Sequence, residues 1–253
     1  MARLLQRWVA EPQSCPYLPS QRSSLEYRMM LDVSPEELDH LLARGWRRFG
    51  PAYFRPRCQA CSECVPLRIP VADFEASRSQ RRVWRSATGF GLRIGRPQVD
   101  ERRLDLYRRW HAMQSASRGW PDEEISPDEY AHQFAFPHPS VREFAYYDQD
   151  RLIAVGIVDE TPHALSAVYT YHDPDYRKHS LGTFSVLFQL EVARSLGKEW
   201  LYLGYRVRGC PSSEYKARFR PHEILRGWPE LNETPDWGDD QRVTSPLLRV
   251  VAH

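Results

Sequence analysis

The chain has 253 residues, a hydrophobic fraction of 42% and a formal net charge of +2. It is long enough to bury a core as one large domain or two small ones, and its composition is ordinary for a soluble globular protein. No apolar run approaches the roughly 18 residues of a membrane span, and the N-terminus lacks the pattern of a secretory signal. We therefore expect a cytoplasmic protein with no membrane partner.

The first half of the chain predicts one helix and one strand. Residues 34–46, SPEELDHLLARGW, predict a helix with Ser34 as the N-cap, Pro35 at the first position and Gly45 as the stop. Residues 65–74, VPLRIPVADF, alternate in polarity and predict a strand with proline-limited ends.

Cysteines are concentrated in the same half. Three of the five lie in CQACSEC with the spacing Cys-x-x-Cys-x-x-Cys, which suits a metal or cluster better than a disulfide framework. Three ligands are too few for a closed tetrahedral zinc site, but Cys15 becomes a fourth if the N-terminus folds back. The candidate ligands for zinc or an iron–sulfur cluster are Cys15, Cys58, Cys61 and Cys64. The alternative, that these are reduced structural cysteines, stays equally open.

The charge is distributed unevenly. From Arg44 to Arg96 there are 12 arginines against three acids, whereas residues 227–240 hold five acids and no base. A basic stretch in a near-neutral protein indicates a polyanion such as nucleic acid, and the alternative is a solvated arginine face. Only three of the 35 basic residues are lysines, and a lysine, unlike an arginine, can lose its proton when buried.

The second half predicts an alternation of helices and strands. A helix over 101–116 has Leu104, Tyr107, Trp110 or His111 and Gln114 along one face. The further elements are a short capped helix at 126–136, strands at 143–148, 151–160 and 164–173, a helix that begins near Ser180, and a strand at 199–207.

A basic, small-residue turn from Arg177 to Gly182 joins the third of these strands to the helix. This order of elements is that of the acetyltransferase-like (GNAT-like) acyl-transfer fold, in which a helix N-terminus offers N–H groups and a positive dipole end to an anion. We therefore expect an α+β protein with an N-terminal cysteine- and arginine-rich domain over 1–97 and a GNAT-like domain over 98–253. The fold class by itself does not fix the function.

Six motifs then occur in order between about residues 8 and 226. They are SCPYLP, GWRRFGPAYFRPRCQACSECVPLRIPV, SRSQRRVWR, DPDYRKHSLG, YLGYRVRGC and YKARFRPHE. Together they resemble the bacterial aminoacyl-tRNA–protein transferases, in the leucyltransferase branch of the arginyltransferase-related family. The resemblance implies an enzyme that moves leucine from leucyl-tRNA to the N-terminal Asp or Glu of a protein, which marks that protein for proteolysis through the N-degron pathway.

The sequence departs from the family pattern at two positions. Leu18 stands where eukaryotic relatives have a second cysteine, which weakens the transfer of their iron–sulfur proposal to this chain. Ser213 stands where the family usually has a methionine, so the lining of the site differs.

The chemistry that the resemblance implies needs no covalent nucleophile and no cofactor. An aminoacyl-tRNA ester is already activated, and the attacking α-amine has a reference pKa of about 7.7 to 8.0. The enzyme must hold the amine and the ester together, remove a proton and stabilise the developing oxyanion.

The turn at the helix start and a lysine in YKARF supply the first candidates. Ser180, Leu181 and Gly182 can offer N–H groups to the ester carbonyl or to a terminal phosphate, although Ser180 as a simple N-cap remains an alternative. Arg177 adds positive charge. Lys216 binds the acidic side chain of the acceptor or polarises the ester.

Other candidates surround these residues. Asp173 and Glu191 bind the acceptor ammonium or take its proton, and Tyr215 lies in the same motif as Lys216. Tyr202 and Tyr205 stack on the terminal adenosine or, as an alternative, pack within the sheet. If SRSQRRVWR is helical, its side chains Arg78, Arg81, Arg82 and Arg85 bind tRNA phosphates.

Three rival functions stay open at this level. Arginyl-tRNA is an alternative donor within the same family. A coenzyme A-dependent acetyltransferase would carry a fuller glycine-rich loop than the one with Ser180 at its middle. A non-catalytic RNA-binding metalloprotein would bind tRNA without transferring anything to peptides.

Overall fold

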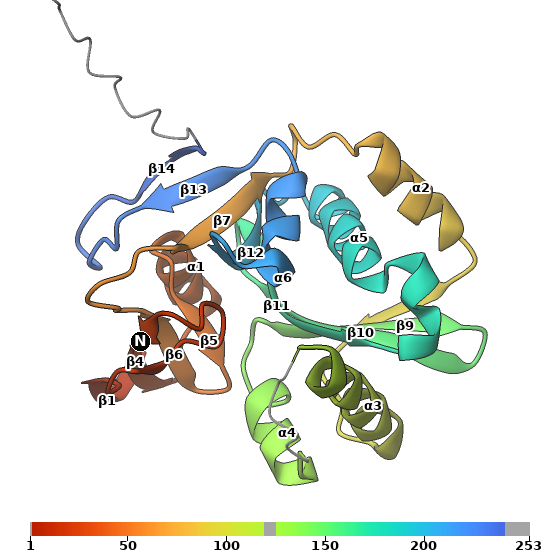
Figure 1. Ribbon diagram of the computed structural model, residues 1–253, viewed down its shortest axis with the longest axis horizontal. Helices are drawn as coiled ribbons and strands as arrows, with labels where there is room; N and C mark the ends of the chain where they lie inside the picture. The colour runs from red at the N-terminus through yellow and green to blue at the C-terminus, as the bar shows by residue number, and fades with distance from the viewer. Residues whose placement is uncertain (1, 119–124, 241–253) are drawn as a thin grey trace, which may run out of the picture.

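The computed structural model describes residues 2–118 and 125–240 (Figure 1). Within these residues the largest element is an eight-stranded sheet. Its order is β14 (Asp236–Asp239), β13 (Glu223–Arg226), β7 (Cys64–Pro70), β12 (Trp200–Val207), β11 (Ala164–His172), β10 (Arg151–Glu160), β9 (Val141–Asp148) and β8 (Gly91–Gly95). Neighbouring strands are antiparallel except for β11 and β12, which are parallel.

A four-stranded sheet from the N-terminal part lies beside the large sheet. Its order is β1 (Arg3–Val9), β4 (Leu25–Leu31), β6 (Ala52–Pro56) and β5 (Arg47–Phe49), and a small hairpin of β2 (Gln13–Ser14) and β3 (Arg22–Ser23) lies between β1 and β4 in the chain. Helix α1 (Pro35–Ala43) packs in this region through Leu38, Leu41 and Leu42.

The helices cover both faces of the large sheet. Helices α2 (Arg78–Ser86) and α5 (Leu181–Ser195) lie on one face, and α3 (Glu101–Arg118) and α4 (Pro127–Phe134) lie on the other (Figure 1). Short helical turns η1 (Pro174–His179), α6 (Pro211–Glu214) and η2 (Tyr215–Arg218) flank α5 and β12. Among the helices of the described residues, none combines the length and apolarity needed to cross a membrane.

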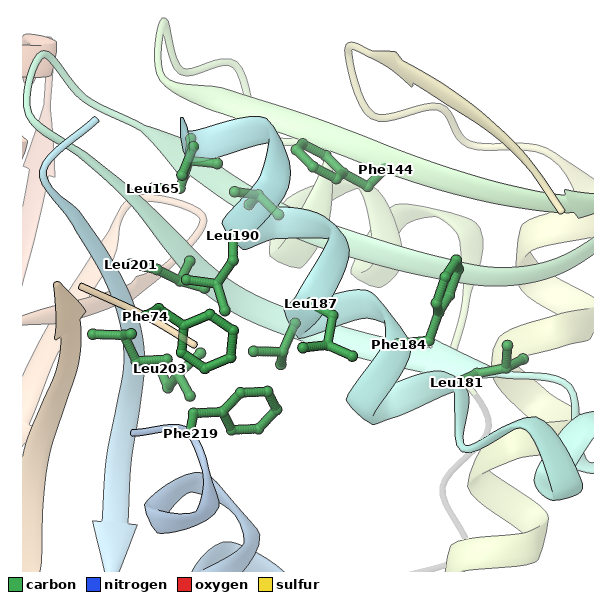
Figure 2. Packing of buried hydrophobic residues seen from close by; sticks show 14 of the residues in the cluster. Phe74, Phe144, Leu165, Leu181, Phe184, Leu187, Leu190, Leu201, Leu203 and Phe219 are labelled. Atoms are coloured by element: carbon green, nitrogen blue, oxygen red, sulfur yellow. The ribbon is translucent and has the colours of Figure 1, made fainter. Parts of the chain in front are cut away.

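The main core lies between α5 and the sheet. Leu187 and Leu190 of α5 lie toward Leu201 and Leu203 of β12, and Phe184 and Leu181 continue the same cluster toward the start of the helix (Figure 2). Phe184, Leu187 and Leu190 follow one another at intervals of three residues and share one side of the helix, as is typical of a helix that packs on a sheet.

Most elements predicted from the sequence are present. Helix α1 has the predicted Ser34 cap, and the three successive strands and the strand after α5 are confirmed as β9, β10, β11 and β12. The strand predicted over 65–74 is present as β7 but ends at Pro70. The segment SRSQRRVWR is helical, as its assignment to tRNA required.

The four-stranded sheet was not predicted, and β4 shows why. The side chains that β4 turns inward are those of Glu26, Arg28 and Met30, which are 1%, 7% and 7% exposed. Two of these three are charged, so the strand lacks the apolar alternation by which half-buried strands are recognised.

The predicted α+β class is confirmed, because the structure mixes helices with mainly antiparallel strands. The large sheet takes β7 and β8 from before residue 97 and its other strands from after it. The division into domains at 1–97 and 98–253 stays a prediction.

Candidate active site

The two parallel strands at the centre of the large sheet separate partway along their length. Strands β11 and β12 pair only at Ala164 with Trp200, Leu165 with Leu201 and Ser166 with Tyr202, although both continue well beyond these residues. Each strand therefore has an open edge in the middle of the sheet. We call the space between these edges the strand gap.

Arg47 of β5 reaches the β11 side of the strand gap. Its guanidinium donates to the Ser166 hydroxyl at 2.5 Å and to the Ala167 carbonyl, so at Ala167 it supplies a donor that a neighbouring strand would otherwise supply. Arg47 is only 9% exposed. Burial lowers the pKa of its guanidinium.

A glycine on β12 makes room for this arginine. Gly204 has a φ of +72°, and a Cβ atom there would lie 3.3 Å from Nε of Arg47. The pairing of β12 with β7 shifts register between Tyr202 and Gly204, which indicates a bulge at this point. A left-handed glycine at a bulge thus allows a buried side chain to approach the backbone closely.

Lys216 of η2 meets the opposite side of the strand gap. Its ammonium donates to the Tyr205 carbonyl at 2.6 Å. Burial, and after it the charge of Arg47, lowers the pKa of Lys216 to about 7, while Cys64 and Cys210 act in the other direction. Lys216 forms no ion pair with any carboxylate of the described residues.

The N-terminus of α5 presents backbone N–H donors. Ser180 has a φ of +51°, its side chain makes no capping hydrogen bond, and its carbonyl accepts from the N–H groups of Thr183 and Phe184. The Leu181 side chain is buried in the core, so only its N–H can serve a ligand. A Cβ atom at Gly182 would meet nothing within 4 Å, so the backbone is accessible there. The N–H groups at a helix start have no intrahelical acceptor.

The two charged candidates before α5 differ in their surroundings. Arg177 is exposed, which fits an added positive charge beside the turn. Asp173 is fully buried and accepts hydrogen bonds from Arg109 at 2.8 Å, Arg151 at 2.5 Å and the Asp175 N–H at 3.0 Å. Burial alone would raise its pKa, but these hydrogen bonds outweigh burial and lower it. A carboxylate that accepts this many hydrogen bonds is a weak base. The same hydrogen bonds hold the turn in place.

The tyrosines predicted to stack on adenosine have packing contacts. The Tyr202 ring lies edge-on to Trp237 at 5.6 Å, and the Tyr205 hydroxyl donates to the carbonyls of Gly45 at 2.8 Å and Phe54 at 3.2 Å. These contacts favour the alternative of packing within the sheet. Tyr215 packs against the core beneath α5.

Glu191 lies apart from the helix start. It is eleven residues after Ser180, or about 16 Å along a helix, and it pairs with Arg194 at 3.0 Å. It lines a surface hollow together with Arg81 and Arg85 of α2. This position brings it near the basic helix rather than near the turn.

The basic face of α2 is open to solvent. Its four exposed arginines form no ion pair within the described residues, and Trp84 on the other side of the helix packs against Phe188 of α5 at 5.5 Å. These arginines are Arg78, Arg81, Arg82 and Arg85. The helix is thus held to the sheet by its apolar side, and its charges face outward, as tRNA binding requires.

The cysteines gather at the edge of the N-terminal part. Cys58, Cys61 and Cys64 line a hollow of about 570 Å³, and Cys58 donates to the Ser24 carbonyl at 3.6 Å. Burial, and after it Cys58, Cys15 and Cys61, raises the pKa of Cys64 to about 12. No three His, Cys, Asp or Glu side chains of residues 2–118 and 125–240 are arranged to hold a metal ion. The present arrangement does not fit a metal, and zinc or an iron–sulfur cluster stays a prediction that elemental analysis would test.

Arg47 is the site residue that sequence reasoning missed. Its signal was the doubled arginine in GWRRFG, inside a stretch with few acids. Nothing local distinguishes Arg47 from Arg48, because their surroundings come from strands more than 100 residues further along the chain.

Comparison with known proteins gives a consistent result. The family described as "Arginine-tRNA-protein transferase, N terminus" matches residues 13–82, and "Arginine-tRNA-protein transferase, C terminus" matches residues 102–226. A distant likeness among solved structures is the C-terminal domain of a putative lysylphosphatidylglycerol synthetase from Agrobacterium fabrum. It has a TM-score of 0.42 and 13% identity, over 69% of this chain and 52% of that chain.

Three curated relatives, each called aspartate/glutamate leucyltransferase, match over nearly their whole length. The protein of Helicobacter hepaticus is 32% identical over 92% of this chain and 97% of its own. That of Campylobacter jejuni strain 81-176 is 36% identical over 87% and 92%, and that of Pseudomonas fluorescens strain Pf0-1 is 35% identical over 90% and 97%. The resemblance predicted from six motifs is confirmed, and the chain belongs to the arginine-tRNA-protein transferase family.

Proposed function

We propose that this chain is an aminoacyltransferase that moves leucine from leucyl-tRNA to the N-terminal Asp or Glu of acceptor proteins. The observation that carries the proposal is the match, over nearly the full length of each chain, to relatives called aspartate/glutamate leucyltransferase. Such an acceptor enters the N-degron pathway, and we assign the reaction to the cytoplasm, where charged tRNAs are found.

The reaction joins an amine to an ester. The nitrogen of the acceptor attacks the carbonyl carbon of the leucyl ester, a peptide bond forms, and the bond to the terminal ribose oxygen of the tRNA breaks. The proton released by the amine goes to that oxygen, which leaves as a hydroxyl. Since the ester is already activated, positioning and charge stabilisation are the main tasks of the protein.

The β11–α5–β12 unit supports an acetyltransferase-like arrangement for these tasks. We assign the N–H groups of Leu181 and Gly182 to an oxyanion or a terminal phosphate, with Arg177 adding charge beside them, because N–H groups at a helix start have no intrahelical acceptor. Lys216, at the strand gap, is the cation that we assign to the acceptor's acidic side chain. The arginines of α2 bind the tRNA backbone.

One assay tests the proposal. The purified chain is incubated with leucyl-tRNA or arginyl-tRNA and with peptides that begin with Asp, Glu or Ala. We expect leucine on the Asp and Glu peptides only. Transfer of arginine alone, equal transfer to the Ala peptide, or no transfer would contradict the proposal. Acetyl-coenzyme A replaces the tRNA in a parallel reaction, and acetylation there would favour the acetyltransferase alternative.

A further inference from the structure

The buried arginines of this protein differ in whether a carboxylate accompanies them. Arg48 pairs with Asp159 at 3.0 Å, Arg55 pairs with Glu26 at 3.0 Å, and each of these four residues is at most 5% exposed. Arg47 is also buried, but within residues 2–118 and 125–240 it forms no ion pair. Asp159 acts on Arg47 only from a distance, because its carboxylate is engaged by Arg48.

A buried charge without a counter-ion is costly, and hydrogen bonds to neutral groups do not remove that cost. The bonds of Arg47 to Ser166 and Ala167 use two of the five N–H donors that a guanidinium carries. A neutral glutamine could make similar bonds at the edge of β11. The retained charge, with no carboxylate partner among the described residues, indicates an anion that these residues do not supply.

Lys216 repeats this situation on the other side of the strand gap. It too is a cation bonded to a backbone carbonyl, that of Tyr205, and it has no carboxylate partner among the described residues. Arg47 packs over Gly204, the residue next to Tyr205, so the two cations meet β12 at adjacent positions. Each of the two cations favours a negatively charged ligand between them.

We propose that Arg47 and Lys216 together form the site for the side-chain carboxylate of the acceptor's N-terminal Asp or Glu. This assignment rests on the proposed function and adds to it a specificity-determining residue, Arg47. A small carboxylate suits the place better than a tRNA phosphate, because Arg47 is 9% exposed whereas the arginines of α2 are open to a large polyanion. Guanidinium groups also match the planar carboxylate, to which they donate two parallel bonds.

The decisive measurement compares acceptors that differ only in charge. Peptides beginning with Asp or Asn have nearly the same shape, so the ratio of their kcat/KM values reports the carboxylate site alone. In Arg47→Gln we expect this ratio to fall about 30-fold or more, while the dissociation constant of leucyl-tRNA stays within about twofold. Arg47→Lys keeps the positive charge, so this variant should keep part of the preference for the Asp peptide over the Asn peptide.

A neighbouring arginine provides the matched control. The double variant Arg48→Gln with Asp159→Asn removes a buried pair together, so no buried charge is left unpaired. It should keep the Asp-to-Asn ratio of the unmodified protein. Circular dichroism of each variant confirms folding, and if Arg47→Gln does not fold, Lys216→Met carries the same test from the other side of the gap.

The outcomes separate this inference from the function on which it rests. An unchanged ratio in folded Arg47→Gln overturns the inference, as does a loss of tRNA affinity at constant ratio, which would move Arg47 to the tRNA. If the unmodified protein transfers no leucine at all, the proposed function fails. Calorimetry with the Asp and Asn peptides then still decides whether Arg47 binds a carboxylate.

Discussion

Arg47 and Arg48 are consecutive residues of one short strand, yet within the described residues only Arg48 has a carboxylate that neutralises its charge. Arg48 turns to β10, where Asp159 pairs with it, whereas Arg47 turns to the strand gap, where a hydroxyl and a carbonyl accept its hydrogen bonds. Successive side chains of a strand point to opposite sides, so neighbours in sequence enter different surroundings. The comparison teaches that a buried basic residue paired with a carboxylate of its own chain stabilises the fold. A buried basic residue that has no such partner indicates a binding site for an anionic ligand.

The largest expected effect tests the paired arginine. Arg48→Gln leaves the Asp159 carboxylate buried without its partner, which should lower the free energy of unfolding by about 3 to 5 kcal/mol. Urea unfolding followed by circular dichroism measures this change. Arg47→Gln should be clearly less destabilised, because it removes an uncompensated buried charge and the glutamine amide can make similar hydrogen bonds to Ser166 and Ala167. Equal destabilisation of the two variants would show that the arginines do not differ as we describe.

The second prediction concerns the glycine that admits Arg47. Gly204→Ala places a methyl group 3.3 Å from the guanidinium Nε at a φ of +72°, so we expect a decrease of about 1 to 2 kcal/mol in stability and a lower Asp-to-Asn ratio. Gly197→Ala is the matched control, since Gly197 has a φ of +65° but nothing within 4 Å. It should be destabilised to a similar extent and keep the ratio. An equal fall of the Asp-to-Asn ratio in both variants would show that this selectivity does not depend on the contact between residue 204 and Arg47.

The third prediction uses the pKa of Lys216. A lysine whose pKa is lowered to about 7 is charged below pH 7 and neutral above it, so the Asp-to-Asn ratio should fall as pH rises from about 6 to 8.5. We expect a change of up to about tenfold, because Arg47 keeps its charge throughout. The ratio cancels the ionisation of the attacking amine, which both peptides share. In Lys216→Met the ratio should be low and independent of pH, and a profile like that of the unmodified protein would contradict the assignment.

The same group predicts how stability depends on pH. The pKa of Lys216 is about 7 in the folded state against a usual value of 10.5, so between these values the unfolded chain binds more protons than the folded one. The contribution of Lys216 to the free energy of unfolding should therefore rise with pH across this window. The urea midpoint of the unmodified protein should therefore rise relative to that of Lys216→Met as pH increases from about 7 to 10.

The smallest expected effect per residue belongs to the exposed arginines. Changing Arg81 and Arg82 to Ala should weaken leucyl-tRNA binding and lower the slope of log affinity against log salt by about 0.7 to 0.9 for each phosphate that the variant no longer neutralises. The Asp-to-Asn ratio should not change. If neither affinity nor slope moves, α2 presents only a solvated face.

Local signals in the sequence predicted the elements near the site well. Ser34, Pro35 and Gly45 marked α1 through capping chemistry, and the rarity of lysine drew attention to Lys216. These signals lie within a few residues of the feature they predict. Short-range chemistry of this kind can be read without knowing the fold.

The remaining features depend on contacts between distant residues. Asp173 is predicted from the sequence to bind the acceptor ammonium or take its proton, but its carboxylate is bonded to Arg109 and Arg151, which lie 64 and 22 residues away. The burial of Arg47 depends on Ser166, 119 residues further along. Such pairings follow from strand order rather than from local pattern, and no spacing rule predicts them.

The short pairing of β11 with β12 has a consequence for the sheet as a mechanical object. Three residue pairs form the only ladder that joins β14, β13, β7 and β12 to β11, β10, β9 and β8 in the described sheet, so it consists of two four-stranded halves held by a narrow seam. An acceptor bound between Arg47 and Lys216 would bridge these halves where hydrogen-bonded rungs are missing. A ligand that binds only the folded state stabilises that state by mass action. Acidic peptides should therefore make the seam between β11 and β12 more rigid and raise the melting temperature.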